Sequence, residues 1–119
     1  MKKQIKDLEL WEVDFLVAKA EGLDPITETT HASGEYYKYV IIEIKSTYFD
    51  KYSPTTNPAQ AWPIIERERI SIDTCEYDDK DNDWLATIGE LKAFSYGKTS
   101  LEAAMRCYIA SKFGDEVSL

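Results

Sequence analysis

Histidine and cysteine, on which many nucleophilic catalytic sites and zinc sites depend, are scarce in this chain. His31 is the only histidine, so a Ser-His-Asp or Cys-His catalytic arrangement would have to be built on it. Cys75 and Cys107 lie far apart in the sequence, and neither has the surroundings of a catalytic thiol. One histidine and two separated cysteines also fall short of the four ligands of a structural zinc site. We therefore expect a protein that is not an enzyme and that has no catalytic residue, metal or cofactor.

The acidic run at residues 79–83, Asp-Lys-Asp-Asn-Asp, is the segment most similar to a metal-binding motif. It places carboxylates at the first, third and fifth positions of a calcium loop, and Glu90 falls at the twelfth. The sixth position, normally glycine, is Trp84 here, and the flanking residues are typical of strands rather than helices. The favoured interpretation is a solvated acidic turn over residues 78–83, and calcium binding is the alternative.

Polar groups that could bind a small molecule concentrate in and around residues 52–70, "YSPTTNPAQAWPIIERERI". An anionic metabolite or nucleotide would bind there through a guanidinium group, with help from nearby hydroxyl, amide and indole groups. Each arginine also has an ordinary partner, since acidic residues flank Arg67 and Glu102 lies four residues before Arg106. The candidate ligand-binding residues are Tyr52, Ser53, Thr55, Thr56, Gln60, Trp62, Arg67, Trp84 and Arg106.

The same segment has the pattern of a helix start. Asn57, followed by a proline and then by Gln60, has the spacing of an N-cap, a first-turn proline and a capping-box partner. Pro63 has no amide hydrogen and biases Trp62 away from the α region. We therefore expect one turn, a break, and a short helix that begins at Pro63 and is anchored by the two isoleucines after it. This scaffold interpretation explains most of the segment, and a binding site is the alternative.

Residues 7–22 predict a helix that is apolar on two sides. Asp7 is its expected N-cap and Gly22 its expected stop. The two apolar stripes are Leu8/Trp11/Phe15 and Leu10/Val13/Val17. Such a helix is covered twice within its own fold, or covered once there and once by another protein. The second possibility suggests a homodimer or a partner protein that contacts one of the stripes.

The remaining elements complete a single α+β domain over residues 1–119. Strands are predicted over 35–46, 69–77 and 84–88, and loops over 23–34 and 89–97. The last helix has the clearest signals: Thr99 and Glu102 form a capping box and Gly114 ends it. Its apolar residues on several sides predict the most buried element. The expected fold is an N-terminal helix, a central antiparallel sheet of about three strands, a short middle helix and a long C-terminal helix.

Charge and composition limit the partners. The formal net charge is −8, no basic cluster offsets it, and the phosphate backbone of a nucleic acid would be repelled. The longest apolar runs are too short to span a membrane, and Lys2 and Lys3 are followed by acidic residues rather than by the apolar core of a signal peptide. Two unpaired cysteines suit a reducing cytoplasm.

Three segments resemble a known family. They are "DFLVAKAEG", the stretch over residues 52–70 quoted above, and "YGKTSLEAAMRCYIASKFGDEV". Together they are similar to the NinX-like family of tailed-phage proteins of unknown function, which is related to phage proteins with an α/β/α-sandwich domain; Ala61 and Trp62 stand where that family usually has two glycines. The resemblance implies a phage or prophage accessory protein in the bacterial host cytoplasm and supplies no catalytic residue.

These observations leave three hypotheses for the function. The leading one is a non-enzymatic accessory protein that binds a host or phage protein. The alternative is a protein that binds or sequesters a small anionic molecule through the candidate residues named above. The third is an acidic mimic of DNA, for which the 22 acidic residues would have to lie in rows.

Overall fold

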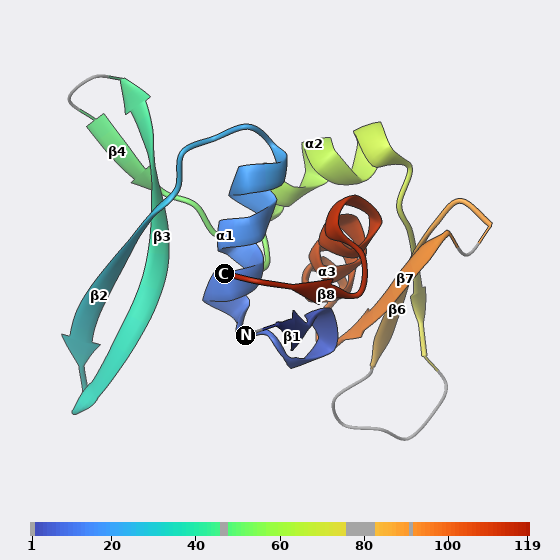
Figure 1. Ribbon diagram of the computed structural model, residues 1–119, viewed down its shortest axis with the longest axis horizontal. Helices are drawn as coiled ribbons and strands as arrows, with labels where there is room; N and C mark the ends of the chain where they lie inside the picture. Colours follow the sequence, from blue (N-terminus) through green and yellow to red (C-terminus); the bar gives the residue numbers. More distant parts are fainter. Residues whose placement is uncertain (1, 46–47, 76–82, 91) are drawn as a thin grey trace.

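Three α-helices and three small antiparallel sheets form the computed structural model, which describes residues 2–45, 48–75, 83–90 and 92–119 (Figure 1). The helices are α1 (Leu10–Ala20), α2 (Pro58–Glu68) and α3 (Ser100–Phe113), with a short 3-10 helix η1 (Ile5–Asp7) before α1. One sheet contains β2 (Ile26–Ala32), β3 (Glu35–Lys45) and β4 (Tyr48–Lys51). Another contains β5 (Ser71–Thr74), β6 (Trp84–Ile88) and β7 (Ala93–Gly97). The two-residue strands β1 (Lys3–Gln4) and β8 (Glu116–Val117) pair near the chain ends.

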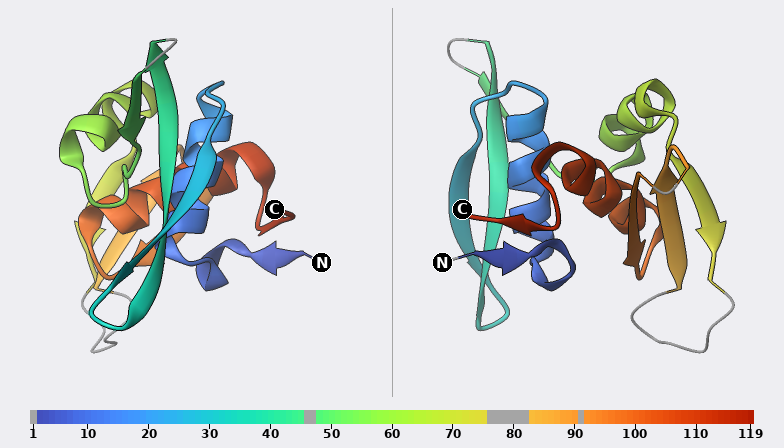
Figure 2. Two further views of the ribbon diagram at one scale, coloured as in Figure 1. Left: turned by 90° about the vertical axis from the view of Figure 1, so that its left-hand side faces the viewer. Right: turned by 45° about the vertical axis from the view of Figure 1, so that its right-hand side comes forward.

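The elements stack in four layers, which Figure 2 shows from the side. The sheet β2–β3–β4 packs on α1, α1 packs on α3, and α3 covers one face of the sheet β5–β6–β7. This arrangement confirms the α+β class and both terminal helices. The predicted strands lie in two sheets that flank the helix pair, β3 in one and β5 and β6 in the other. No helix in the described ranges is long and apolar enough to cross a membrane.

Helix α1 is covered on both sides within the chain. Val13 and Val17 are fully buried, whereas Leu10, at the first turn, is 39% exposed. The expected N-cap, Asp7, is wrong: Glu9 occupies that position and forms a capping box with Glu12. The expected stop is confirmed, because Gly22 follows the last turn with φ +78° and donates to the Lys19 carbonyl. The double apolar pattern of α1 therefore needs no second protein to cover it.

Helix α2 runs without a break through Pro63. Asn57 accepts from the Ala59 amide at 3.0 Å, which confirms the N-cap. The predicted break is wrong, because Ala61, Ile64 and Ile65 are all buried and hold the helix on the core on both sides of the proline. Local preference for a break, worth about 3 kcal/mol in an isolated helix interior, yields here to tertiary packing.

The prediction for α3 is confirmed in most respects. Thr99 accepts from the Glu102 amide at 3.1 Å, and Gly114 ends the helix with φ +85°. All residues from 103 to 110 are buried, so α3 is the most buried helix. The carboxylate of Glu102 accepts from the Lys98 amide and from Arg106 rather than from the amide of its expected cap.

Two segments that the sequence assigns to loops form strands. Residues 26–32 form β2, all of whose residues are exposed. Residues 93–97 form β7, where buried and exposed side chains alternate along a very short strand. Neither segment carries the alternating apolar pattern over enough residues to predict a strand.

Gly97 sets the distance between β7 and α3. A Cβ at this position would lie 2.5 Å from the Ala103 amide nitrogen and 2.9 Å from its Cα. These are backbone atoms in a buried helix that cannot move independently. We expect Gly97→Ala to lower the free energy of unfolding by about 1–3 kcal/mol, as overpacking does elsewhere, in urea titrations. Ser95→Ala, on the same face of β7, is the matched control, and an equal loss in both variants would contradict this explanation.

Candidate functional site

The segment at residues 53–56 binds back onto α1. Thr55 is 2% exposed and donates twice to the carboxylate of Asp14: its amide to Oδ1 at 2.9 Å and its hydroxyl to Oδ2 at 3.1 Å. Burial raises the pKa of Asp14 to about 6, and the two bonds from Thr55 offset only part of that effect. The hydroxyl-rich part of the family motif therefore serves as an anchor between α1 and the start of α2.

Gln60 reinforces the same turn. Its side chain accepts from the Ser53 amide at 2.7 Å and donates to the Lys51 carbonyl at 2.9 Å. It does not reach back to Asn57, so the predicted capping-box partner is wrong: the amide of Asn57 donates instead to the Ser53 carbonyl at 2.8 Å. Tyr52 is buried beside this turn, and burial raises the pKa of its hydroxyl to about 12. Thr56 is exposed and donates to the Ser53 carbonyl.

Arg67 joins all three helices. Its guanidinium makes two bonds to the Glu21 carboxylate, at 3.0 and 2.6 Å, and a third to Glu68 at 2.9 Å. The Tyr108 hydroxyl also donates to Glu21 at 2.5 Å. Burial alone would raise the pKa of Glu21, but the bonds from Arg67 and Tyr108 outweigh it and the pKa is lowered. The positive charge expected to bind an anion is thus already matched by two carboxylates.

The two candidate tryptophans lie apart from this network. Trp62, on α2, is 52% exposed and donates to Glu66 at 2.7 Å. Trp84 lies on β6, in the other half of the molecule, and packs partly against the core. The structure therefore brings Tyr52, Ser53, Thr55, Thr56 and Gln60 together in one turn, whereas Trp62 and Trp84 do not join their hydrogen bonds.

Metal ligands do not cluster in the described part of the chain: no group of three or more His, Cys, Asp or Glu side chains could hold an ion there. His31 lies on the exposed hairpin of β2 and β3, where its ring packs on Tyr36 with centroids 4.8 Å apart. Residues 79–82 of the acidic run, for which calcium binding was the alternative, lie outside the described residues.

The two thiols should differ sharply in reactivity. Cys107 is fully buried in α3, and burial raises the pKa of its thiol to about 12, whereas Cys75 is half-buried. Because the thiolate is the reactive form, a thiol reagent at pH 8 should modify Cys75 in the native protein and Cys107 only after denaturation. Cys75→Ser should therefore abolish the reaction of the native protein, and rapid labelling of that variant would contradict the prediction.

Arg106, another predicted site residue, borders a large hollow. It is 7% exposed, and its guanidinium donates to the carbonyls of Ile5 (2.5 Å) and Leu8 (2.7 Å) as well as to Glu102 (3.1 Å). Each of its three nitrogens is engaged. Arg106 therefore fastens the N-terminal segment to α3 and builds one wall of the hollow.

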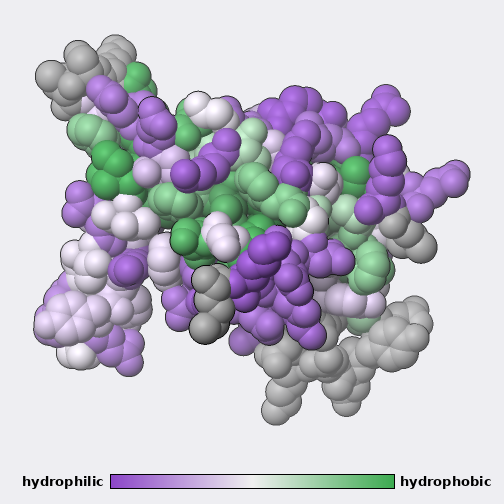
Figure 3. All heavy atoms as spheres, viewed as in Figure 1, coloured by the Kyte–Doolittle hydropathy of each residue, from purple (hydrophilic) through white to green (hydrophobic). Residues whose placement is uncertain are grey.

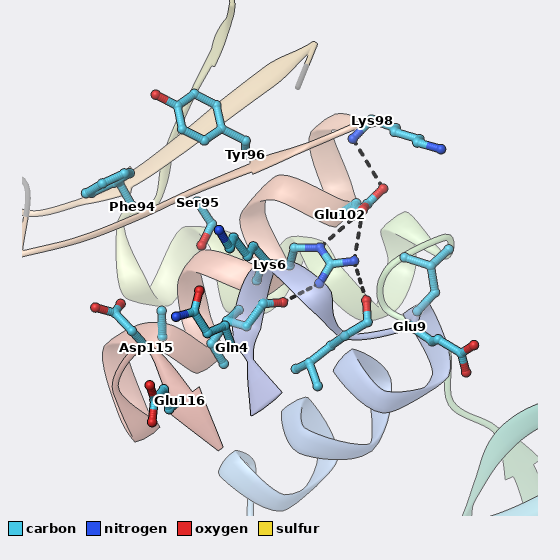
Figure 4. A pocket seen from close by; sticks show the side chains of 15 residues that line it. Gln4, Lys6, Glu9, Phe94, Ser95, Tyr96, Lys98, Glu102, Asp115 and Glu116 are labelled. Carbon is cyan, nitrogen blue, oxygen red and sulfur yellow. Dashed lines mark hydrogen bonds and ion pairs between the residues drawn. The ribbon is translucent and has the colours of Figure 1, made fainter. Parts of the chain in front are cut away.

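This hollow, which we name the β7 groove, has a volume of about 980 Å³ and lies between the N-terminal segment and β7 (Figure 4). Its base is formed by α3, and one end is bordered by the residues just before and within β8. Figure 4 shows the rings of Phe94 and Tyr96 on the side of β7 away from Gln4 and Lys6. The groove is lined by Gln4, Ile5, Lys6, Leu8, Glu9, Leu10, Phe94, Ser95, Tyr96, Lys98, Glu102, Arg106, Ala110, Asp115 and Glu116.

Strand β7 has an unpaired edge along this groove. Among the described residues the sheet order is β5–β6–β7, so β7 has a neighbouring strand there on one side only. The Cys75 amide donates to the Asp83 carbonyl at 2.8 Å, and hydrogen-bonded pairs alternate along an antiparallel ladder. The odd-numbered residues of β6 therefore bond to β5, and the even-numbered ones bond to their partners in β7, which are odd-numbered. This alternation leaves the backbone groups of Phe94 and Tyr96 pointing to the open edge.

The open edge of β7 ends at Lys98. The amide of Lys98, the next even-numbered residue, donates to the Glu102 carboxylate at 3.2 Å. The open stretch of backbone is thus limited to β7 itself. The sequence does not predict this groove, because its walls are about 90 residues apart in the chain. Its one signal is Arg106, a charge between the apolar residues Met105 and Cys107 of α3.

Hydrophobic side chains on the face shown in Figure 3 gather in the middle, over the helices, and hydrophilic residues lie around them. Exposed aromatic side chains lie on both three-stranded sheets, among them Tyr36 on β3 (77% exposed) and Phe94 on β7 (54% exposed). Most of the exposed aromatic side chains in the described part of the chain thus lie on strands; Trp62 on α2 and Phe113 on α3 are exceptions, and none lies on α1.

Comparisons with known proteins agree with the motifs. The family model for NinX of bacteriophage P22 matches residues 4–112. A phage protein from Bacillus cereus ATCC 14579, known from a 2.0 Å crystal structure, has a similar fold with a TM-score of 0.54 and 13% sequence identity, over 88% of this chain and 93% of that chain. No curated protein matches the sequence. Because the family model covers most of the chain, this protein belongs to the bacteriophage P22 NinX family.

Proposed function

We propose that this NinX-family protein is a non-enzymatic phage accessory protein that acts in the host cytoplasm by binding another protein, from the phage or from its host. The observation that supports this most is the open edge of β7 beside the β7 groove, with the rings of Phe94 and Tyr96 exposed next to it. Unpaired strand edges and exposed aromatic rings are features that proteins use to bind one another.

The chemistry of the groove lining favours binding over catalysis. The lining contains neither histidine nor cysteine. Its buried cation, Arg106, has all three nitrogens engaged by the protein itself. The small-ligand alternative has less support, since Arg67 is matched by Glu21 and Glu68.

Site-specific photo-crosslinking tests the proposal. A benzophenone side chain in place of Lys6, which lines the β7 groove, should attach to a defined protein in extract of the phage-infected host. The same side chain in place of Lys19, which is exposed on α1 outside the groove, is the matched control. Mass spectrometry would identify the partner, and the purified partner should bind the wild-type chain directly. No attachment at residue 6, or equal attachment at both positions, would refute the proposal.

A further inference from the structure

We infer that the β7 groove binds an extended segment of its partner, with basic residues at alternate positions, which adds to β7 as a fourth strand of the sheet β5–β6–β7. The inference rests on the proposed function and specifies the chemistry of the partner. Three independent features of the groove support it: the backbone of β7, the two rings beside it and the carboxylates opposite.

The backbone of β7 can accept one more strand. The amide and carbonyl groups of Phe94 and Tyr96 point to the open edge, as the alternation of the ladder requires. The groove of about 980 Å³ leaves this edge accessible. Because the Lys98 amide is already bonded to Glu102, strand addition would involve about five residues of the partner, a usual length for a strand.

The rings of Phe94 and Tyr96 determine what the partner presents on the outer face of the sheet. Their centroids lie 6.2 Å apart in an edge-to-face arrangement, and the two side chains are 54% and 39% exposed. Directly opposed residues of neighbouring strands share a face, and aromatic side chains pair well with aromatic or β-branched ones. Alternate residues of the added strand should therefore be of these types.

The remaining residues of the added strand would point into the groove, whose lining has four carboxylates and three cations. Glu102 and Arg106 neutralise each other at 3.1 Å. The other acidic residues of the lining are Glu9, Asp115 and Glu116, and its other basic residues are Lys6 and Lys98. Asp115 and Glu116 lie together near the Phe94 end of β7 in Figure 4, and the whole chain carries a net charge of −8. These charges favour lysine or arginine at the inward positions.

Peptides of defined pattern test the inference. The probe is a fluorescein-labelled peptide of about seven residues in which valine and lysine alternate. In fluorescence anisotropy it should bind the wild-type protein, more weakly as salt is raised. The matching valine-glutamate peptide should bind at least about tenfold more weakly, because it would face like charges. The valine-lysine peptide with alternate amides N-methylated should also lose at least about tenfold, because it cannot complete the ladder.

Three variants separate the contribution of the Tyr96 amide to peptide binding from that of the Tyr96 ring. Tyr96→Pro removes an amide from the open edge without removing a ladder bond, a position at which strands accept proline, and it should weaken binding at least about tenfold. Tyr96→Thr keeps the amide and should weaken binding less. Thr74→Pro, at the corresponding edge position of β5, should bind as the wild type does.

Several outcomes would overturn the inference. These are equal binding of the basic and acidic peptides, full binding of the N-methylated peptide, or equal losses in Tyr96→Pro and Thr74→Pro. A dimer that Tyr96→Pro dissociates would show that a second copy of this chain occupies the edge. If the peptides fail while a crosslinker at Lys6 still captures a partner, strand addition is wrong and the proposed function stands.

Discussion

Replacing Arg106 with methionine should cost more stability than any other single change considered for this protein. The change leaves the carbonyls of Ile5 and Leu8 without their donor and the carboxylate of Glu102 without its cation, in a region where Arg106 is only 7% exposed. Removing one partner of a buried ion pair typically costs about 3–5 kcal/mol. A domain of this size has a total stability of about 5–15 kcal/mol, so urea and thermal unfolding should show a large loss.

The matched control is Arg67→Met. Like Arg106, Arg67 makes several hydrogen bonds, and three of them go to carboxylates. Its side chain is 49% exposed, however, so water can replace these bonds. Exposed ion pairs contribute about 0–1 kcal/mol, so this variant should unfold close to the wild type. Arg106→Lys should fall between the two, because an ammonium group keeps the charge but cannot copy the planar fork. Similar losses in the two methionine variants would contradict the assignment of Arg106 as the buried anchor.

The loss of Arg106 should also affect the β7 groove. Its bonds to Ile5 and Leu8 span 101 and 98 residues of sequence and hold the N-terminal wall of the groove on α3. Hydrogen exchange at the Ile5 and Leu8 amides should accelerate in Arg106→Met even at temperatures where the core remains folded. Acceleration spread evenly over the whole chain would indicate global destabilisation instead of a detached wall.

The parts of the fold that the sequence predicts well depend on contacts between close neighbours. Thr99 and Glu102, three residues apart, form their N-cap bond, and Asn57 caps α2 through the Ala59 amide. The pair of Glu102 and Arg106 at i, i+4 spacing is also present, at 3.1 Å. Such pairs can be recognised because a few residues determine both the backbone conformation and the partner.

The parts that the sequence does not predict depend on distant partners. Asp14 has the pattern of a polar residue between two apolar stripes, yet it is buried against Thr55, 41 residues away. Pro63 has a local preference that burial of its neighbours overrides. Strand β2 has no apolar face to recognise, since all of it is exposed. The β7 groove belongs to the same class, because an unpaired edge is a property of the assembled sheet and not of any one segment.

Replacing Asp14 with asparagine should change how stability depends on pH. The pKa of Asp14 is raised from 3.8 to about 6 in the folded protein. Between these values the folded protein holds a proton that the unfolded chain has released, so the free energy of unfolding falls as pH rises. At 1.36 kcal/mol per unit the decrease attributable to Asp14 is about 3 kcal/mol, complete above pH 6. An asparagine side chain cannot ionise, so the Asp14→Asn variant should lack this decrease.

Asparagine can replace Asp14 because both hydrogen bonds to the Asp14 carboxylate come from Thr55, one from its amide and one from its hydroxyl. The amide oxygen can accept from the Thr55 N–H as Oδ1 does now, and the amide nitrogen can donate to the Thr55 hydroxyl in place of the present bond to Oδ2. At pH 7 the Asp14→Asn variant should therefore be at least as stable as the wild type. Asp14→Ala is the contrasting control: it leaves the Thr55 amide and hydroxyl unpaired in a buried position and should be destabilised.

Comparing how the free energy of unfolding of wild type and of Asp14→Asn depends on pH separates the effect of Asp14 from that of groups whose pKa is shifted in the opposite direction. The pKa of Glu21 is lowered in the folded state, so its contribution to stability is lost as pH falls. Lys51 acts on Asp14 by favouring the ionised form. Glu21 and Lys51 are present in both proteins. The free energy of unfolding of wild type minus that of Asp14→Asn, measured in urea from pH 4 to 7.5, therefore reports the titration of Asp14. Parallel curves would mean that Asp14 ionises normally in the folded protein, and that the contact between α1 and the turn before α2 is more hydrated than its burial indicates.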